Sequence, residues 1–379
     1  MNAKTRVLRI IPELNYGGVE TRVTQQVKST SLASEFELTI CGFHKEGFAA
    51  ETVRAAGAEV HILDASPSVL NFRATLALRK YLTKNKFDIV HSSVPEANFH
   101  AALAGALARQ RCVITEEVGD PSVRSLRGHL LAWTSMRLSH HTIGVSDAVT
   151  RYLVDHLRLP RHRVTHINNG VDIFETPSYS DKQKARERFG IAPDAIVVGS
   201  VGRMNDKHKR FSDLLCAIAI LKSCVPRIHC LLVGDGQDLE ILQSHARDLA
   251  IDNNVSFVGQ LNDIRPAYAA MDVFALLSEQ EAFGLVVVEA MISRLPVVAT
   301  YVGGMSEIVI DGVTGYFVER YSPNDASLKL KNLLESKEKR EAMGEAGRER
   351  AKEKFSLEIY HRNLSTLYMR LKPSSAHGL

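Results

Sequence analysis

Short apolar runs alternate with helix-periodic segments along most of this chain, in two successive series. A short apolar run between polar segments is typical of a strand that is buried on both faces of a sheet. The first series of such runs lies at residues 6–11, 36–43, 58–65, 87–93, 111–117 and 141–146. The second series lies at residues 195–202, 228–236, 255–261, 273–278 and 296–303. Strands separated by helices predict βαβ units, so we expect an α/β protein with two doubly wound, Rossmann-like parallel sheets.

The polar stretch 177–182 lies between the two series and predicts the linker between two domains. We therefore expect an N-terminal domain over residues 1–178 and a C-terminal domain over residues 179–355. The last helical segment, within 356–379, follows the second series, and its periodicity allows it to pack on either domain. Ligands of open parallel sheets bind outside the carboxyl ends of the strands, so the loops after the strands should carry the chemistry.

Composition and charge exclude several classes of protein. The 379 residues carry 47 Lys and Arg against 43 Asp and Glu, and this small net charge does not argue for nucleic-acid binding. No apolar run approaches the ~20 residues that span a bilayer, and the N-terminal apolar stretch is too short for a signal peptide. We therefore expect a cytoplasmic location. The five cysteines form no CxxC pair, which argues against disulfides and a zinc ribbon.

The first candidate site is the glycine pair Gly17-Gly18, between the first predicted strand and a helical segment. Glycines let the backbone approach a ligand closely, and the start of a helix offers N–H groups to an anion. The GxGxxG spacing of dinucleotide-binding proteins is absent here, which argues against NAD. An ordinary tight turn is the alternative interpretation.

The second candidate site is a group of cations after the first strand of the second series. Arg203 follows Gly202, and Lys207, His208 and Lys209 come close behind. Cations between a strand and a helix suit a phosphate group. A solvated basic loop is the alternative interpretation.

The third candidate site is the segment from Glu281 to Met291, which follows the strand 273–278. Gly284 is expected to open a helix with free N–H groups at its start. Glu281 and Glu289 would lie about 12 Å apart along a continuous helix. This distance exceeds the roughly 5–9.5 Å between paired glycosidase carboxylates. It therefore argues against an acid–base pair, and suggests that the two carboxylates accept hydrogen bonds from hydroxyls at two places on one extended ligand. The alternative interpretation is that these acidic residues only cap the helix or carry surface charge.

Together these motifs resemble one family, the retaining glycosyltransferases of family 4, which have the GT-B fold. The resemblance covers essentially the whole chain, and the Glu281–Glu289 motif in its EAFGL context is its most specific part. Further matching segments lie at residues 87–109, 144–149, 167–172, 233–236, 257–261 and 302–318. The resemblance implies two domains that face each other across a cleft, with the closing helix crossing back to the N-terminal domain.

The resemblance also implies a role for each matching residue around the donor diphosphate. Arg203 and a lysine would hold the diphosphate. The family usually has a lysine five residues after that arginine. His208 stands there in this chain, so Lys209 aligns through a loop that is one residue longer, and Lys207 remains an alternative.

Other residues would contact the rest of the donor. Glu289 would bind the ribose, and Glu281 would bind the donor sugar. The backbone N–H groups of Phe283, Gly284 and Leu285 would bind the sugar and the β-phosphate. Val258 and Gly259 would lie along the base, and Gly18 would approach the phosphates from the N-terminal domain.

The sequence departs from this family at Glu117. The family often has a histidine near the transferred sugar, in a T-x-H context, where this chain reads Thr115-Glu116-Glu117. An ionised carboxylate accepts hydrogen bonds and cannot donate them. We expect Glu117 to face the acceptor, to disfavour an anionic acceptor, and to favour a neutral or amino-bearing one.

Residues 121–141 combine arginines with leucines and the single tryptophan of the chain, Trp133. A basic amphipathic helix of this kind can contact the inner face of a membrane or a lipid acceptor. A helix packed on its own sheet, with a solvated basic face, is the alternative interpretation.

These observations predict a glycosyltransferase that moves a hexosyl group from a sugar nucleotide, a UDP-sugar by family frequency, to an acceptor hydroxyl with retention. The acceptor would be a glycan, a lipid-linked glycan or a small molecule, and the sugar nucleotide would be a co-substrate rather than a cofactor. No Asp-x-Asp occurs in the sequence, so we expect no catalytic metal. The alternatives are a nucleotide-sugar epimerase of similar architecture and a non-catalytic sugar-nucleotide binding protein.

Overall fold

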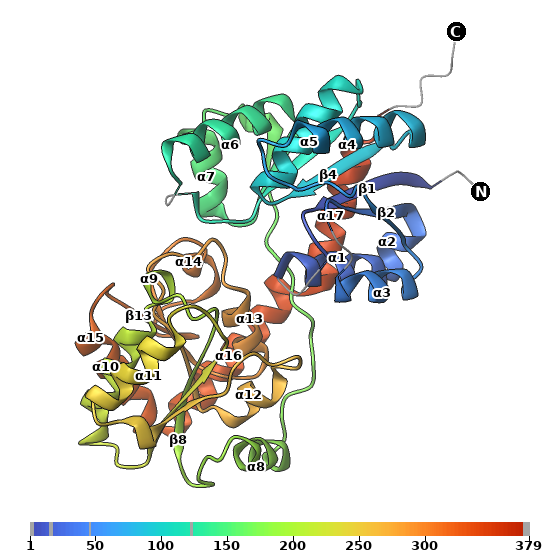
Figure 1. Cartoon of the computed structure of the whole chain (residues 1–379). Coiled ribbons are helices and arrows are strands. Elements are labelled where there is room, and N and C mark those ends of the chain that lie inside the picture. The colour runs from blue at the N-terminus through green and yellow to red at the C-terminus, as the bar shows by residue number, and fades with distance from the viewer. Residues whose placement is uncertain (1–3, 15–17, 45–46, 122–123, 374–379) are drawn as a thin grey trace. The chain divides into compact units, whose positions relative to one another are not determined.

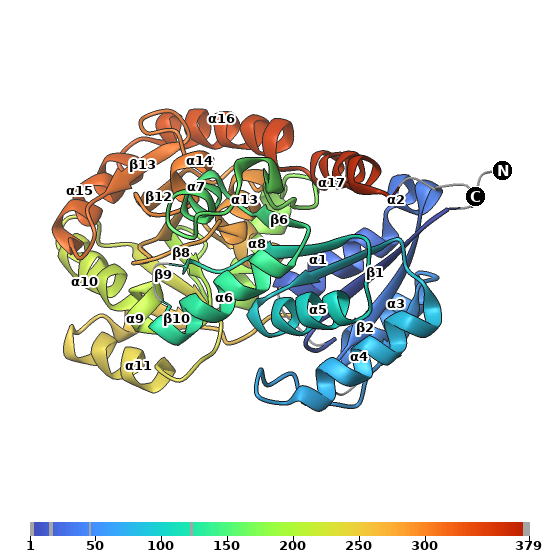
Figure 2. The ribbon, with the colours of Figure 1, turned by 90° about the horizontal axis from the view of Figure 1, so that it is seen from above.

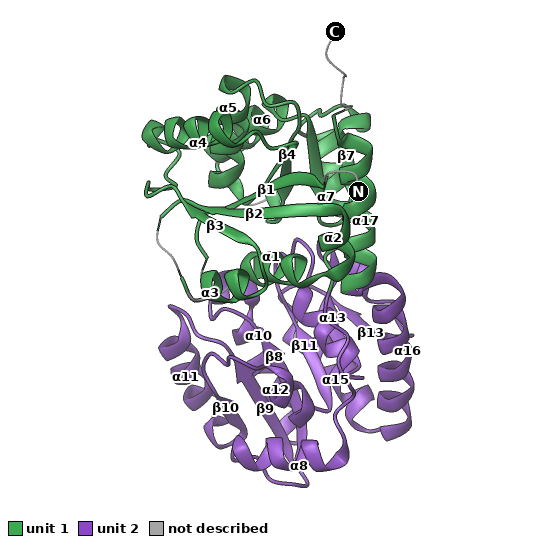
Figure 3. Ribbon diagram, turned by 90° about the vertical axis from the view of Figure 1, so that its right-hand side faces the viewer, with its two compact units in different colours: residues 1–170, 357–379 green, residues 171–356 purple. Residues whose placement is uncertain are grey.

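The computed structural model describes residues 4–14, 18–44, 47–121 and 124–373, and the chain divides into two compact units (Figure 3). Unit 1 comprises Met1–Gly170 and Leu357–Leu379, and unit 2 comprises Val171–Ser356. Each unit contains one wholly parallel sheet with helices on both faces, as the alternating sequence pattern predicts.

The sheet of unit 1 has seven parallel strands in the order β3-β2-β1-β4-β5-β6-β7. The order reverses between β1 and β4, as in Rossmann-type sheets. The strands are β1 (Thr5–Ile11), β2 (Phe36–Gly42), β3 (Glu59–Ile62), β4 (Ile89–Ser93), β5 (Val113–Glu117), β6 (His141–Gly144) and β7 (Val164–His166).

The helices of unit 1 form a layer on each face of this sheet (Figure 1). One layer contains α4 and α5, whose buried side chains pack on Leu8, Ile10 and Val90, and α6 packs beside α5. The other face carries α1, α2, α3 and the C-terminal helix α17. The helices are α1 (Gly18–Lys28), α2 (Thr30–Glu35), α3 (Phe48–Ala55), α4 (Phe72–Asn85), α5 (Pro95–Leu107), α6 (Leu126–Leu138), α7 (Asp147–Asp155) and α17 (Leu357–Leu371).

The sheet of unit 2 has six parallel strands in the order β10-β9-β8-β11-β12-β13, which reverses between β8 and β11. The strands are β8 (Ile196–Val201), β9 (Ile228–Val233), β10 (Val255–Phe257), β11 (Val273–Leu276), β12 (Val297–Thr300) and β13 (Gly315–Val318). The helices are α8 (Tyr179–Arg188), α9 (Asp206–Lys209), α10 (Phe211–Lys222), α11 (Leu239–Asp248), α12 (Arg265–Ala270), α13 (Leu285–Ile292), α14 (Met305–Ile308), α15 (Pro323–Leu334) and α16 (Lys337–Phe355).

The division of the chain falls after Gly170, and not within the predicted linker at residues 177–182. Ser178 caps α8, and its hydroxyl and the carboxylate of Asp181 form a reciprocal capping box. The polar composition of this stretch therefore reflects a helix start rather than a linker. Val171 already belongs to unit 2, since its N–H donates to the Phe355 carbonyl at 2.8 Å.

The structure contains two strands that the sequence analysis did not predict, β7 and β13. Each is an edge strand, and polar residues interrupt the apolar run of β7. The closing helix α17 belongs to unit 1, as the family resemblance implied. Among the described residues, no helix has the length and apolar character needed to cross a membrane.

Candidate active site

The carboxyl ends of β8 and β11, which are neighbouring strands, bring two of the predicted site residues together. The Lys209 ammonium lies 2.5 Å from the Glu281 carboxylate, and both side chains are largely shielded from solvent. A backbone hydrogen bond of 2.9 Å from Glu279 N–H to the His208 carbonyl fastens the same two loops. Of the two candidate phosphate-binding lysines, Lys209 is therefore the one held beside the predicted donor-sugar carboxylate.

Arg203 and Lys207 extend from the loop after β8 as exposed cations. In the described ranges neither side chain has an ion-pair or hydrogen-bond partner. The backbone that carries Arg203 is nevertheless fixed, because Met204 is fully buried and its N–H donates to the Asp235 carbonyl at 2.9 Å. Arg203 thus offers a free guanidinium from an ordered loop, which suits a diphosphate.

The loops after β8, β9 and β10 meet through their backbones. Gly234 has φ +134°, and a Cβ atom there would lie 1.9 Å from the Gly202 carbonyl oxygen, so only glycine fits. The Gly234 N–H donates to the Gly259 carbonyl at 2.9 Å, and the Val258 N–H donates to the Leu232 carbonyl at 3.1 Å. Val258 and Gly259, the predicted base-lining residues, therefore lie beside the cation-bearing loop.

Gly284 is the residue just before α13, its N-cap, and has a left-handed conformation with φ +110°. This backbone conformation is strained for any other residue, and a Cβ atom there would also lie 1.9 Å from Met305 Cε, which would have to move. The Gly304 N–H donates to the Glu281 carbonyl at 3.1 Å and fixes the loop that precedes the helix. The first two N–H groups of α13, those of Leu285 and Val286, have no intrahelical acceptor, whereas the Val287 N–H donates to the Gly284 carbonyl at 3.0 Å. Phe283 is buried against the ring of Phe355, with the ring centroids 5.7 Å apart.

Glu289 lies one turn further along α13 and has a partner of its own. The Tyr268 hydroxyl donates to Glu289 Oε2 at 2.7 Å, and Tyr268 is 1% exposed. Burial raises the pKa of the Glu289 carboxyl, and the hydrogen bond from Tyr268 opposes that rise. Glu281 and Glu289 are therefore separately held carboxylates, consistent with contacts to two parts of one ligand. Tyr268 had no signal in the sequence, since α12 is remote from the motif.

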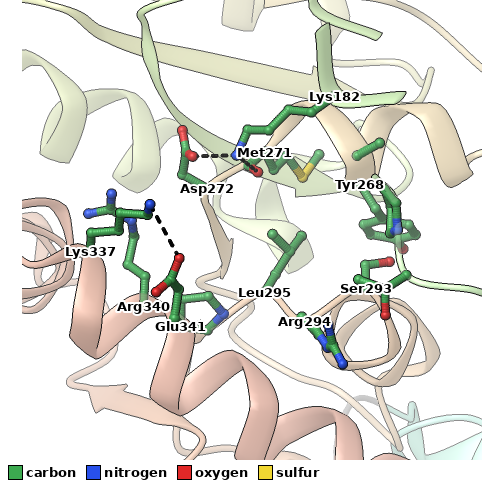
Figure 4. A pocket seen from close by; sticks show the side chains of 14 residues that line it. Lys182, Tyr268, Met271, Asp272, Ser293, Arg294, Leu295, Lys337, Arg340 and Glu341 are labelled. Atoms are coloured by element: carbon green, nitrogen blue, oxygen red, sulfur yellow. Dashed lines mark hydrogen bonds and ion pairs between the residues drawn. The ribbon is translucent and has the colours of Figure 1, made fainter. Parts of the chain in front are cut away.

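A cavity of about 290 Å³ lies at the opposite edge of the unit 2 sheet (Figure 4). Its lining includes Asp272, just before β11, and Pro296, just before β12, so it opens at the amino ends of the strands. Its cations already have partners: Lys182 pairs with Asp272 at 2.6 Å and Lys337 with Glu341 at 3.6 Å. This cavity is therefore separate from the group of predicted site residues at the carboxyl edge.

In unit 1, Glu117 ends β5 and is 1% exposed. Its carboxylate pairs with the Arg124 guanidinium at 2.6 Å and accepts a hydrogen bond from the Gly119 N–H at 3.2 Å. Burial raises the pKa of the Glu117 carboxyl, and Arg124 opposes that rise. The expectation that Glu117 disfavours an anionic acceptor did not include Arg124, and it no longer follows because the ion pair carries no net charge. Of the glycine pair, Gly18 begins α1 and Gly17 lies outside the described residues.

A second buried carboxylate, Glu116, has a structural role that the sequence analysis did not identify. Arg22 pairs with Glu116 at 2.8 Å, and Arg9 lies 3.7 Å from it. Although burial alone would raise the pKa of Glu116, Arg22 and the neighbouring cations hold it well below its ordinary value. Tyr368 of α17 lies 2.6 Å from His91 Nδ1 in the same cluster. This network anchors the closing helix to the sheet of unit 1.

We expect Glu117→Gln to lower kcat at least ~10-fold while leaving the affinity for a free nucleoside diphosphate unchanged. The substitution keeps the shape but removes the carboxylate charge at the carboxyl end of β5 and leaves Arg124 without its counter-ion. The double variant Glu117→Gln/Arg124→Gln is the control, because it restores neutrality without restoring the carboxylate. Normal turnover of the single variant, or full recovery of turnover in the double variant, would remove Glu117 from the acceptor side of the reaction.

Two family models match consecutive parts of the chain. Residues 16–175 match Glycosyltransferase Family 4, and residues 181–350 match Glycosyl transferases group 1. The first match covers unit 1 without β1 and α17, and the second covers most of unit 2.

Individual proteins show the same relationship. The D-inositol 3-phosphate glycosyltransferase of Corynebacterium kroppenstedtii is 31% identical over 71% of this chain, and the match spans 61% of that protein's length. The capsular polysaccharide biosynthesis glycosyltransferase CapM of Staphylococcus aureus is 25% identical over 81% of this chain and 84% of its own. HepE of Anabaena, solved in complex with UDP and glucose, superposes with a TM-score of 0.85 at 22% identity, covering 96% of this chain and 99% of its own. The chain therefore belongs to the GT-B glycosyltransferases, with a family 4 domain followed by a group 1 domain.

Proposed function

We propose that this chain transfers a hexosyl group from a UDP-sugar to an acceptor hydroxyl, with retention at the anomeric carbon and without a metal ion. The observation that carries the proposal is the carboxyl edge of the unit 2 sheet. There the free cation Arg203, the Lys209–Glu281 pair and the N–H groups that begin α13 are held by ordered loops. HepE of Anabaena, of the same fold, has been solved with UDP-glucose, which supports the choice of nucleotide.

The Lys209–Glu281 pair is suited to a donor that carries both phosphates and hydroxyls. Phosphate oxygens can take the Lys209 ammonium, and sugar hydroxyls can donate to the Glu281 carboxylate, so each member exchanges one partner for another. In the free chain the Lys209 ammonium and the Glu281 carboxylate neutralise each other at 2.5 Å. When the donor is bound, its phosphates and hydroxyls would take over as partners of these two groups. Glu289, already held by Tyr268, keeps a free oxygen for the ribose hydroxyls.

The transfer itself requires no attacking side chain. The acceptor oxygen forms a bond to the anomeric carbon on the face from which the diphosphate departs, and the acceptor proton passes to a departing phosphate oxygen. Negative charge grows on that phosphate as the carbon–oxygen bond breaks. Arg203, Lys209 and the start of α13 would stabilise that charge, which is the main contribution required of the protein.

The acceptor would bind to unit 1, beside the ion pair that Glu117, the last residue of β5, forms with Arg124. A neutral pair offers both acceptor and donor groups, which suits a hydroxyl-rich glycan, a lipid-linked glycan or a small polyol. We include contact with a membrane surface through residues 121–141 in this proposal.

Product analysis with and without an acceptor distinguishes this proposal from its two rivals. We expect the labelled sugar of a UDP-sugar to appear on the acceptor, in the anomeric configuration of the donor, with release of UDP. Isomerisation of the donor without an acceptor would instead indicate an epimerase. Binding of the donor with no product across a panel of glycan, lipid-linked and polyol acceptors would indicate a non-catalytic binding protein.

We expect full transferase activity in excess EDTA. The motivation is the absence of Asp-x-Asp from the sequence, together with cations and helix N–H groups where the diphosphate would lie. The measurement is the initial rate after exhaustive chelation and again after addition of Mn²⁺ or Mg²⁺. A rate that vanishes with the chelator and returns with the metal would show that a metal stabilises the leaving group.

A further inference from the structure

One face of unit 1 combines exposed apolar side chains with unpaired cations. Helices α4, α5 and α6 lie side by side on this face, where Figures 1 and 2 both show them. Eight of the eighteen large apolar side chains exposed in the described chain belong to these helices or immediately precede α4. These eight side chains are Leu70, Phe72, Leu76, Leu107, Leu126, Leu130, Trp133 and Leu138.

The exposed apolar side chains of α6 form a stripe along one side of the helix. Leu126 is 89% exposed, Leu130 64% and Trp133 42%, and their spacing of four and three residues places them on one face. The guanidinium of Arg137, one turn further on, lies 5.4 Å from the Trp133 ring centroid. The opposite side of α6, including Ala132 and Met136, is buried. The helix therefore packs on unit 1 through its inner side, and the apolar stripe on its outer side is not needed for that packing.

The charge on this face is almost entirely of one sign. Within α4, α5 and α6, the single acidic residue is Glu96, in the first turn of α5. Six exposed cations oppose it, and within the described chain none of them has an ion-pair partner. The six cations are Arg73, Arg79, Lys80, Lys84, Arg127 and Arg137.

We infer that the α4–α6 face docks on an anionic phospholipid bilayer. Leucine, phenylalanine and tryptophan side chains enter the boundary between headgroups and acyl chains, while arginine and lysine attract anionic headgroups. A soluble polyanion would use the cations but not the apolar stripe. A second copy of this chain would bring two cationic faces together, and like charges would repel. The inference rests on the membrane contact of residues 121–141 included in the proposed function, which it extends to α4 and α5 and to anionic lipid. The surface is separate from the proposed donor site and its test needs no sugar nucleotide, so it can fail while the transferase proposal holds.

Trp133 provides the readout, because it is the only tryptophan in the chain and lies in the stripe. The full chain is mixed with vesicles of phosphatidylcholine alone, or of phosphatidylcholine with phosphatidylglycerol, and both co-sedimentation and tryptophan emission are measured. We expect roughly tenfold or stronger binding to the anionic vesicles, with a blue shift of emission, and loss of both at high salt.

Matched pairs of variants test whether vesicle binding depends on the α4–α6 face or on exposed residues elsewhere. Leu126→Ser/Leu130→Ser and Arg79→Glu/Arg127→Glu should each lower vesicle binding about tenfold or more. The controls are Ile241→Ser/Leu328→Ser and Arg247→Glu/Lys354→Glu, which change exposed residues of unit 2 and should bind like the unmodified chain. All eight positions are exposed, so folding should persist, and circular dichroism checks this.

Three results would overturn the inference. The first is no preference for anionic vesicles over neutral ones. The second is binding to heparin as tight as to vesicles, without a blue shift and unaffected by Leu126→Ser/Leu130→Ser, which would indicate a polyanion site. The third is a concentration-dependent dimer that Leu130→Ser abolishes, which would indicate an interface between copies.

Discussion

Arg203→Ala and Lys209→Ala are each expected to lower kcat by ~10²–10³, the loss that follows removal of one donor aimed at a developing negative charge. Arg203 has no partner among the described residues, so its removal disturbs no internal contact. Steady-state kinetics with a UDP-sugar give the effect, and binding of UDP alone shows whether the loss is specific to the transition state.

Lys209 needs a second control because its removal leaves Glu281 without its partner. Lys209→Ala/Glu281→Gln removes the orphaned charge, and we expect it to fold normally yet to remain slow. Arg247→Ala, on the exposed side of α11, should turn over normally. Near-normal kcat in both Arg203→Ala and Lys209→Ala would rule out the proposed phosphate role.

Glu289→Ala is expected to raise the KM for the donor about 10–10²-fold, with a smaller change in kcat. A carboxylate that accepts two ribose hydroxyls makes charge-assisted hydrogen bonds of about 1.5–3 kcal/mol each, partly replaced by water in the variant. A donor with a 2′,3′-dideoxyribose should bind the unmodified chain as weakly as the natural donor binds the variant. Equal affinity for the two donors would show that Glu289 does not contact the ribose.

Tyr268→Phe tests the same carboxylate through its hydrogen-bond partner. Burial raises the pKa of Glu289 and the Tyr268 hydroxyl opposes that rise, so removing the hydroxyl should raise this pKa further. The ionised carboxylate is the form that accepts two hydroxyls, so donor affinity is present above this pKa and is lost as pH falls through it. The midpoint of that loss should therefore move to higher pH in Tyr268→Phe, whereas a merely structural effect would weaken binding equally at all pH values.

The fold was predictable because its strands are buried on both faces, and such strands leave short apolar runs that few other structures produce. The edge strand β7 is hard to predict because an edge strand need not be apolar throughout, and β7 ends at His166. The edge strand β13 is apolar, but its run of four residues, Gly315–Val318, is too short to stand out. The stretch 177–182 resembles a linker in composition because a capping box is as polar as a linker. The capping pair, Ser178 and Asp181, could have been recognised from its spacing.

The candidate site was predictable where its residues follow strands directly, as Arg203 and Glu281 do. The partners of these residues were not predictable, because they come from elements remote in sequence. Tyr268 reaches Glu289 from α12, and only the three-dimensional structure, in which its hydroxyl contacts α13, reveals the partnership. Arg124 neutralises Glu117 from the segment after β5, and this pairing reversed a charge argument that treated Glu117 alone.

The central claim is that the carboxyl edge of unit 2 binds a nucleoside-diphosphate sugar, and thermal unfolding across a panel of UDP-, GDP- and ADP-sugars tests it most directly. A ligand at 100 times its dissociation constant stabilises the folded chain by about 2.7 kcal/mol. We predict that a UDP-sugar raises the Tm by several degrees, and that Arg203→Ala and Glu289→Ala each remove most of that shift. A panel in which no sugar nucleotide shifts the Tm, or an undiminished shift in both variants, would contradict the account.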